Sequence, residues 1–562
     1  MSGQLLLLVR AIFLQSSKDT NNVYDSVILE HNHNYVGRIV IYFGQVSVNQ
    51  SITFLMQKNF FFSFMFFVSL HFVNAQGTTV KVVDLKTNES IPYANVTINK
   101  TENLVSNAEG YFSVSDLNGD ESSMVAISYL GYISQAISLA EIKRNGNVIR
   151  LQPGVYELDA VDVSKTKPDP NTIMAQVKKN LQQNYSSGGH SSKDMLFMRT
   201  GTSMKASKLD FEIDKSTGFS KQSLKSANSE LKRFTSNIIS HPPLVFTDIL
   251  ANYYKLPKSP ADKVAPAPKL EVVKATKMKD ENRSISFDEL EQTAGKIVLQ
   301  HLDSTKYYRI KSGWFGSRDT ISLRKDFNKN KKKKKDAKNH LTASRDQLSQ
   351  FLYTNNFAQS STLDFVKSPE IYEYTYDGAM YSAENEFVYV LKFKPKKSRA
   401  NFQGTLYISE TDYAVVRADF GLAPGKKLDG INLKLLLGVK MSENVSRGTL
   451  IYAPNPSGTG YYLRYASTET GQYFYINRPL KFIELTDEEK DVVSFDIKVE
   501  GSSVDKVEFL NISHDEISAD QYAQVKEEDF NYIALKRYDP SIWKNYSAIE
   551  PLEEMKQFKV VE

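Results

Sequence analysis

The feature that most constrains the fold of this chain is a series of short segments in which apolar and polar residues alternate. The clearest series lies between residues 371 and 420, where single polar residues separate Tyr372, Tyr374 and Tyr376. A second run with the same period contains Phe387, Tyr389, Leu391 and Phe393. A period of two residues places successive side chains on opposite faces of a β-strand. Because short polar turns separate these runs, we predict an antiparallel meander.

Composition extends this prediction to the whole chain. Aromatic residues make up 12% of the sequence, with 31 Tyr and 32 Phe but only 2 Trp, and these side chains favour half-buried pleated surfaces. At 562 residues the chain exceeds what one hydrophobic core usually supports. We therefore predict a mainly β protein with more than one domain.

A first β-rich domain is predicted at residues 76–163. Val80 and Val82 lie on one face of a strand that a polar turn connects to residues 91–98, so the pair is predicted to form a hairpin. Gly110 suits a tight turn, and Gly131 suits a bulge or a close backbone approach within a strand at 125–132. About seven short strands in this length predict a small β-sandwich.

These residues resemble a known family, the carboxypeptidase regulatory-like domain, which is a transthyretin-like or immunoglobulin-like β-sandwich. The resemblance covers residues 77–163, and its closing segment is residues 158–163. Its most specific positions form a structural motif: Gly110, Tyr111, Phe112, Tyr129, Gly131 and Tyr132. The resemblance implies an envelope protein of the kind found in Bacteroidetes, with a structural rather than catalytic sandwich.

A larger body is predicted at residues 172–562, after a polar linker at 164–171. Pro170 suits a helix start, and Ile173, Val177 and Leu181 have helical spacing up to about Asn184. Further strands are predicted at 195–204, 209–219, 297–302, 307–311, 320–323, 433–475, 492–499 and 507–512. An exposed loop is predicted at 257–270, and an aromatic tail segment at 539–546 is expected to pack on the body.

A basic insertion interrupts the body at residues 326–350 and includes Lys331 to Lys335. We interpret it as a solvated helix face or insertion; the alternative is a patch that contacts anionic lipid headgroups.

Part of the body resembles a second family, the LolA-like periplasmic lipoprotein carriers, whose curved half-barrel encloses an apolar cavity. The candidate cavity residues are Tyr389, Leu391, Phe393, Leu406, Ile408 and Val415. The body is accordingly expected to be a larger antiparallel, curved-sheet, half-barrel-like α+β domain.

Residues 56–75 have the three parts of a secretory signal: Lys58, an apolar run from Phe60 to Val73, and small residues up to Ala75. The run is too short to span a bilayer comfortably, so cleavage after Ala75 is predicted. Residues 1–55 are then a mistranslated or disordered leader, with Met56 as the start. The chain has no cysteine, which suits a bacterial envelope better than a disulfide-rich secreted domain.

The sequence contains no recognised catalytic motif. Downstream of Ala75 only five histidines occur, at 190, 241, 301, 340 and 514, and none forms the His-Glu-x-x-His pattern of a zinc peptidase. His514, beside Asp515 and Glu516, comes nearest and is interpreted as an exposed loop cluster. There is also no Gly-x-Ser-x-Gly elbow, phosphate loop or dinucleotide fingerprint. No cofactor, metal site or catalytic residue is therefore predicted.

The net charge of +5, with both signs interspersed, gives no reason to expect nucleic acid as a partner. We predict a non-catalytic binding module of the periplasm or outer membrane, with an envelope protein or an apolar ligand as its partner. The alternatives are a LolA-like carrier of lipid or lipoprotein and a hydrolase of unrecognised type.

Overall fold

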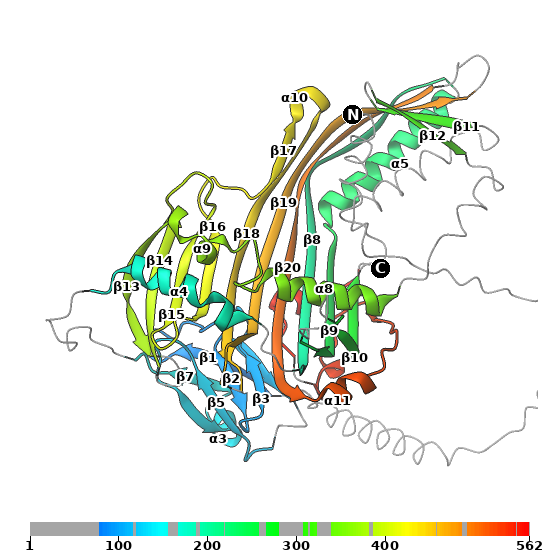
Figure 1. Cartoon of the computed structure of the whole chain (residues 1–562). Helices are drawn as coiled ribbons and strands as arrows, with labels where there is room; N and C mark the ends of the chain where they lie inside the picture. Colours follow the sequence, from blue (N-terminus) through cyan, green and yellow to red (C-terminus); the bar gives the residue numbers. More distant parts are fainter. Residues whose placement is uncertain are drawn as a thin grey trace, which may run out of the picture.

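The computed structural model describes residues 78–115, 120–154, 167–186, 191–217, 220–257, 266–279, 307–312, 315–322, 339–381, 386–456, 458–485, 492–546 and 548–560. A small β-sandwich is followed by a large, curved, open sheet that carries helices (Figure 1). The predicted fold class is thereby confirmed. The predicted leader, the signal peptide, the strand at 297–302, the closing strand at 158–163 and the run Lys331 to Lys335 lie outside the described residues.

The sandwich consists of two small sheets packed face to face. The first has the order β4-β1-β7, with β1 (Thr78–Asp84), β4 (Tyr111–Val114) and β7 (Val148–Leu151). The second has the order β3-β2-β5-β6, with β2 (Asn95–Ile98), β3 (Glu102–Val105), β5 (Met124–Ser128) and β6 (Gln135–Ser138). Helix α3 (Leu139–Arg144) connects the two sheets. Alternate strand residues fill the core, including Val80, Val96 and Phe112.

The predicted hairpin between the first two strands is wrong. β1 pairs with β4 and, in parallel, with β7, whereas β2 pairs with β3 and β5 in the opposite sheet. A single bridge between Val83 and Ser90 is all that remains of the expected pairing. The alternating pattern located both strands. Because β1 and β2 lie in opposite sheets, their apolar faces are buried in the core between the sheets.

The strand predicted at 125–132 is too long. β5 ends at Ser128, and the amide of Tyr132 donates to the carbonyl of Tyr129, 3.0 Å away, to close a turn. Gly131 lies in this turn with φ +80°, a conformation that glycine adopts without strain. It is therefore a turn residue and not a bulge within a strand.

Among the described residues, the large sheet has 14 strands. Its main path runs β13 (Tyr372–Tyr381), β14 (Phe387–Pro395), β15 (Phe402–Ser409), β16 (Val415–Leu422), β18 (Val439–Pro454), β19 (Tyr461–Glu484), β20 (Val492–Ile517), β8 (Ser191–Ser216), β9 (Leu244–Lys255), β10 (Lys269–Lys279) and β21 (Ile533–Leu535). β17 (Gly430–Leu433) pairs with β18, β11 (Tyr307–Ser312) with β19, and β12 (Phe315–Ser322) with β11. β13 to β16 form the predicted antiparallel meander.

Three helices pack on one face of the sheet: α4 (Pro170–Tyr185), α8 (His340–Thr354) and α9 (Asp364–Lys367), which the 3₁₀ turn η3 (Pro369–Ile371) follows. α4 matches the predicted helix. The Asp169 side chain accepts from the Thr172 amide at 3.1 Å and caps the first turn of α4. The second half of the predicted basic insertion lies in α8, which buries Leu341 and Leu348. The remaining helical elements of the described ranges are α5 (Lys221–Ser240), α10 (Lys434–Leu437), α11 (Ala519–Gln524), η4 (Pro540–Ile542) and α12 (Glu553–Lys556).

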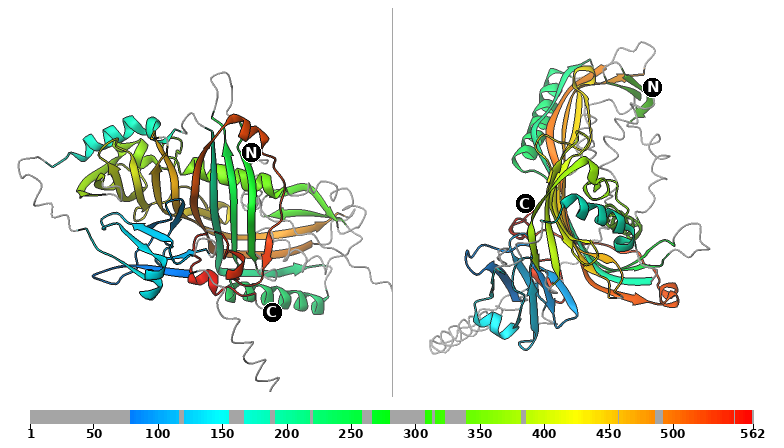
Figure 2. Two further views of the ribbon diagram at one scale, coloured as in Figure 1. Left: turned by 90° about the horizontal axis from the view of Figure 1, so that it is seen from below. Right: turned by 60° about the vertical axis from the view of Figure 1, so that its left-hand side comes forward.

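The middle of the sheet is buried on both faces. Leu196 and Met198 of β8 point into the core shared with α4 and α8, while Phe197 between them points into the core of the sandwich. Likewise, Leu450 of β18 points into the core on the helix side, and Ile451 points into the core of the sandwich. Figure 2 shows the helices and the sandwich on opposite sides of the sheet. The predicted aromatic tail segment packs on the sandwich side through Trp543, as expected.

Strands β8, β18, β19 and β20 continue beyond this body as an arm; α10 projects from it beside β18, and β11 and β12 lie at its end (Figure 1). The sequence predicted β8 as two strands, at 195–204 and 209–219, but it is continuous from Ser191 to Ser216. Its pairing with β20 shifts between Ala206 and Lys208, so Ser207 is an extra residue that reverses the alternation. Helix α5, which the pattern did not predict, packs on the arm through Ile238.

Candidate functional site

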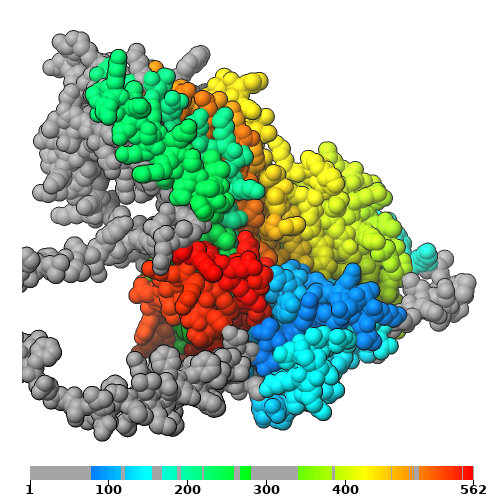
Figure 3. All heavy atoms as spheres, turned by 180° about the vertical axis from the view of Figure 1, so that it is seen from behind, coloured from blue at the N-terminus to red at the C-terminus, as the bar shows by residue number. Residues whose placement is uncertain are grey.

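Two cavities lie where the C-terminal tail (residues 533–560) packs on the large sheet, and the first of them also borders the sandwich; we call this region the junction. The first cavity has a volume of about 310 Å³ and is lined by Ser113 of the sandwich, Arg199 of β8 and Trp543 of the tail, among others. The second, of about 300 Å³, lies between β8, β9, β19 and β20 and the tail residue Met555. Figure 3 shows the tail, in red, beside the sandwich, in blue. Arg199 lines both cavities.

A row of three charged residues crosses the sheet beneath the junction. Arg199 of β8 is the register partner of Glu508 on β20 and of Asp248 on β9. Directly opposed residues of antiparallel strands project on the same face, about 5 Å apart. All three are buried, with Asp248 at 0%, Glu508 at 2% and Arg199 at 4% exposure, so their pairing decides how much their burial costs.

Arg199 forms a bidentate ion pair with Asp248. Its Nε and Nη2 donate to the two carboxylate oxygens of Asp248 at 2.9 and 2.7 Å, and its Nη1 donates to the carbonyl of Ile549 at 3.0 Å. Burial lowers the pKa of the Arg199 guanidinium, but the Asp248 carboxylate outweighs burial and raises that pKa above its ordinary value. The pair therefore stays ionised and fixes the tail to the sheet.

The tail is also fixed to the sandwich, through the turn that precedes Gly110. The Asn107 side chain donates to the carbonyl of Glu550 at 3.1 Å. The Ser113 hydroxyl donates to the Glu550 carboxylate, whose other oxygen lies 2.8 Å from Lys556 Nζ. Since Asn107 and Glu550 are buried, these bonds are shielded from water, and the tail holds the sandwich against the sheet.

Glu508 is the charged residue of the row that lacks a close partner. Its Oε1 has no hydrogen-bond partner among the described residues, because the Arg199 guanidinium turns toward Asp248. Burial raises the pKa of Glu508, and the nearby positive charges of Lys506 and Arg199 only partly offset this effect. This carboxyl faces the second cavity.

We expect Glu508→Gln to remove a pH-dependent loss of stability. The pKa of Glu508 is higher in the folded than in the unfolded chain, so the unfolded chain gives up this proton first as pH rises. Folding stability should therefore fall above about pH 4.5, by about 1.4 kcal/mol for each pH unit up to the folded-state pKa. Urea unfolding at acidic and at slightly alkaline pH should show a smaller difference for Glu508→Gln than for the wild type. Glu528→Gln, at an exposed position, is the control; an unchanged difference in Glu508→Gln would contradict the assignment.

A second buried acid–base cluster surrounds Asp194 at the start of β8. Its Oδ1 bonds with His514 Nδ1 and accepts from Asn511 at 3.0 Å, and its Oδ2 lies 3.2 Å from Lys255 Nζ. Burial alone would raise the pKa of Asp194, but Lys255 and His514 outweigh burial and hold it well below its usual range. Both oxygens are thus engaged, and the cluster joins β8, β9 and β20.

The interpretation of His514 as part of an exposed loop cluster is wrong. His514 lies within β20, its side chain is 12% exposed, and its ring stacks on Tyr462 with centroids 4.7 Å apart. The adjacent acidic residues suggested a loop, but alternation along the strand turns His514 inward.

The acidic residues of these clusters are mostly engaged in hydrogen bonds and ion pairs. No group of three His, Cys, Asp or Glu side chains in the described ranges could hold a metal ion. Asp248 and Asp194 already have both oxygens engaged, and the buried Glu508 carboxyl borders a cavity without a base or nucleophile bonded to it.

The first half of the predicted structural motif lies in the turn at Gly110 and in β4. A Cβ on Gly110, where φ is +83°, would lie 3.0 Å from the carbonyl oxygen of Val82, so the turn needs glycine. Phe112 is buried in the sandwich core, whereas the Tyr111 ring lies 5.1 Å from Lys81 Nζ and 5.8 Å from Lys556 Nζ. The structure therefore brings this motif to the tail.

The tyrosines of the second half of the motif lie beside Gly131. The Tyr132 hydroxyl donates to Asp84 at 2.8 Å, and the Tyr129 ring lies 5.0 Å from the Arg417 guanidinium of β16. This half of the motif therefore contacts the meander.

The candidate cavity residues lie in the core on the helix side of the sheet. Tyr389 is partly buried and the others are buried: Leu391, Phe393, Leu406, Ile408 and Val415. Phe365 of α9 stacks on Phe393 with ring centroids 4.7 Å apart and also contacts Phe402 and Phe420. Neither junction cavity is lined by these residues.

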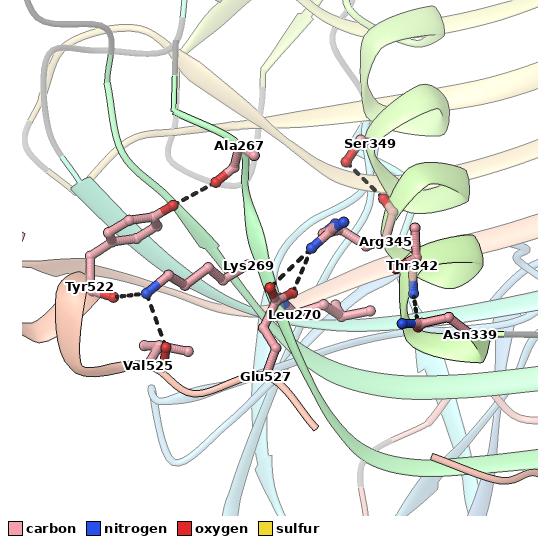
Figure 4. A network of polar contacts seen from close by, with 10 residues as sticks. All are labelled: Ala267, Lys269, Leu270, Asn339, Thr342, Arg345, Ser349, Tyr522, Val525 and Glu527. Carbon is pink, nitrogen blue, oxygen red and sulfur yellow. Dashed lines mark hydrogen bonds and ion pairs between the residues drawn. The ribbon is translucent and has the colours of Figure 1, made fainter. Parts of the chain in front are cut away.

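A further polar network joins β10, α8 and the segment after α11 (Figure 4). Lys269 Nζ donates to the carbonyls of Tyr522, Ala523 and Val525 at 2.9 to 3.2 Å, which caps the C-terminal end of α11. The Glu527 carboxylate accepts from Arg345 and from the Leu270 amide at 3.0 Å. The end of the loop predicted at 257–270 is therefore wrong, because β10 begins at Lys269 and Leu270 is buried.

The charged row was not among the sequence-predicted sites, although a signal for it exists. Arg199 and Asp248 are single charges inside otherwise apolar strand segments, where isolated charges are rare unless paired. Glu508 is followed by the apolar residues Phe509 and Leu510. Each of the three charged residues lies two positions from an apolar residue that packs in the core of the sandwich, and alternation along a strand places both on the same face. These apolar residues are Phe197, Leu250 and Leu510.

Comparison with known proteins identifies the N-terminal domain. Residues 79–163 match the family model of the CarboxypepD_reg-like domain, so this part of the chain is such a domain, as its sequence predicted. Neither a curated protein nor a solved structure matches the chain. The LolA-like resemblance is therefore not confirmed. None of the helices in the described ranges combines the length and the hydropathy that a membrane-spanning helix requires.

Proposed function

We propose that this chain is a non-catalytic binding protein of the cell envelope in which the sandwich and the sheet act as one rigid scaffold. The matched domain is of a regulatory rather than catalytic type. The observation that carries the proposal is the single apolar core that runs from the sandwich into the sheet and the tail. Phe197, Trp543 and Ile549 belong to this core, and the Phe197 and Trp543 rings meet edge to face at 5.4 Å.

This arrangement differs from a domain on a flexible tether. Interfaces between independently moving domains are usually more polar, whereas here buried aromatic side chains and the Arg199–Asp248 pair lie between the parts. The scaffold therefore presents the sandwich and the sheet in a constant relative position. Such a platform suits an envelope protein partner or an apolar ligand; nucleic acid is not among the partners we propose.

The envelope location is tested by fractionation of bacterial cells that express the full chain with a C-terminal tag. We expect the protein in the periplasmic or outer-membrane fraction, with Gln76 as the first residue by N-terminal sequencing. A control with Phe66→Asp and Phe67→Asp in the apolar run should remain unprocessed. Recovery of the wild type in the cytoplasmic fraction would overturn the proposal.

The two alternatives have less support. A lipid carrier needs an open apolar cavity, but the candidate cavity residues pack against α9, and the junction cavities are lined by charged as well as apolar groups. Native mass spectrometry of the purified protein would favour a carrier if it detected bound lipid. A hydrolase would need Glu508 or another acid to be essential, so loss of a measured hydrolytic activity in Glu508→Gln would favour that alternative.

A further inference from the structure

A hairpin that projects from the arm exposes apolar side chains that the sheet does not cover. β17, α10 and the start of β18 form a hairpin, residues 430–442, which we call the tip. Leu435 and Leu436 at its turn are 104% and 78% exposed, the two highest values among the exposed large apolar residues of the described ranges. Single exposed leucines are ordinary, but two adjacent ones at a projecting turn are not expected of a surface that meets only water.

The backbone of the tip holds these leucines outward. Gly438 ends α10 with φ +67°, and a Cβ there would lie 2.0 Å from the carbonyl oxygen of Asn477. The Gly438 carbonyl also accepts from the Asn477 amide at 2.7 Å. The turn is therefore anchored to β19, and Leu435 and Leu436 project from a fixed base.

The charges of the tip are of one sign. Residues 430–442 contain Lys434 and Lys440 and no acidic residue. Lys434 Nζ lies 4.2 Å from the Tyr475 ring centroid, and Lys440 Nζ lies 5.2 Å from that of Tyr473. Asp429 and Glu443 face each other at the base of the hairpin, beyond the tip on the side of the body.

Leucines at the apex with lysines and tyrosines behind them match the layers of a membrane surface. Apolar side chains enter the acyl boundary, tyrosine rings favour the headgroup level, and lysines attract anionic headgroups. Figure 1 shows α10 projecting from the arm far from the sandwich, while β19 and β20 continue past it to β11. A protein partner would not require this order of residue types along the arm.

We propose that the tip is a membrane-contact site that inserts Leu435 and Leu436 into the surface of an anionic phospholipid bilayer. The lysine ammonium groups pair with phosphate groups, and the bilayer is touched but not crossed. The contact leaves the sandwich and the junction free for their own partner. The identity of the biological membrane rests on the proposed envelope location. Vesicle binding itself is measured on purified protein, so its result does not depend on export.

The test is flotation of the purified full chain with vesicles of phosphatidylethanolamine and phosphatidylglycerol, and with vesicles of phosphatidylcholine alone. We expect binding to the anionic vesicles, and a loss of about tenfold or more in Leu435→Ser/Leu436→Ser, because the burial of two leucines is removed. We expect weaker binding to the neutral vesicles. Lys434→Gln/Lys440→Gln should reduce binding to the anionic vesicles and leave binding to the neutral vesicles unchanged. The fluorescence of the Leu435→Trp variant should shift to the blue on addition of anionic vesicles.

The matched control is Leu85→Ser/Ile133→Ser, which removes two apolar side chains of the sandwich that are each 49% exposed. It should bind vesicles as the wild type does. The proposal is overturned if the wild type binds neither vesicle, if the control loses as much binding as the tip variant, or if sedimentation shows that the tip instead forms a dimer that Leu435→Ser/Leu436→Ser dissociates. Cytoplasmic recovery in the fractionation experiment overturns the envelope proposal alone and leaves the vesicle result standing.

Discussion

Replacing Arg199 by methionine is expected to destabilise the protein by about 3–5 kcal/mol, because it leaves the Asp248 carboxylate buried without its counter-charge. Asp248 is fully buried, and both of its oxygens accept from Arg199. The substitution also removes the bond to the Ile549 carbonyl that holds the tail. The free energy of unfolding from urea titration at neutral pH measures the loss, and limited proteolysis of residues 533–560 shows whether the tail is released.

The double variant Arg199→Met/Asp248→Asn separates the pair from the packing around it. It leaves no unpaired charge at this position, so it should recover part of the stability lost in Arg199→Met. The control Arg447→Met affects the exposed pair between Arg447 and Glu469 and should cost no more than about 1 kcal/mol. An Arg199→Met variant as stable as this control would show that the charged row does not hold the junction together.

The same row shows which part of the site the sequence could predict. Alternation assigns Arg199 and Phe197 to one face of a strand, and it does so wherever the strand is regular. It does not say that β20 and β9 flank β8, because those partners come from distant parts of the chain and their register depends on tertiary packing. Single charges inside apolar segments could therefore be noticed, but their pairing could not.

The success of the fold prediction follows the same division. The meander β13–β16 was predictable because its consecutive strands pair with each other across short turns. In β8 the extra residue Ser207 reverses the alternation, so one strand was predicted as two. The sandwich was predicted as a class, while the pairing of β1 was not, because a strand with one apolar face is compatible with several neighbours.

Phe365→Ala is expected to destabilise the protein by about 3–5 kcal/mol, the range for truncation of a buried phenylalanine. Phe365 is fully buried, and its ring contacts the rings of Phe393, Phe402 and Phe420. The half-barrel interpretation placed an apolar ligand near Phe393, and the structure instead places a side chain of the chain itself there. The variant therefore opens the space that a carrier would keep open in the wild type.

A cavity formed in this way should bind a small apolar molecule, since a space lined by aromatic and aliphatic side chains stays dry. Benzene should raise the melting temperature of Phe365→Ala and leave the wild type unchanged, because binding to the folded state alone stabilises it. Tyr353→Ala, at an exposed aromatic residue of α8, is the control and should change stability by less than about 0.5 kcal/mol. The contrary result would be that benzene stabilises the wild type as strongly as Phe365→Ala. The helix side of the sheet would then already contain an accessible apolar cavity, and this result would favour the carrier alternative.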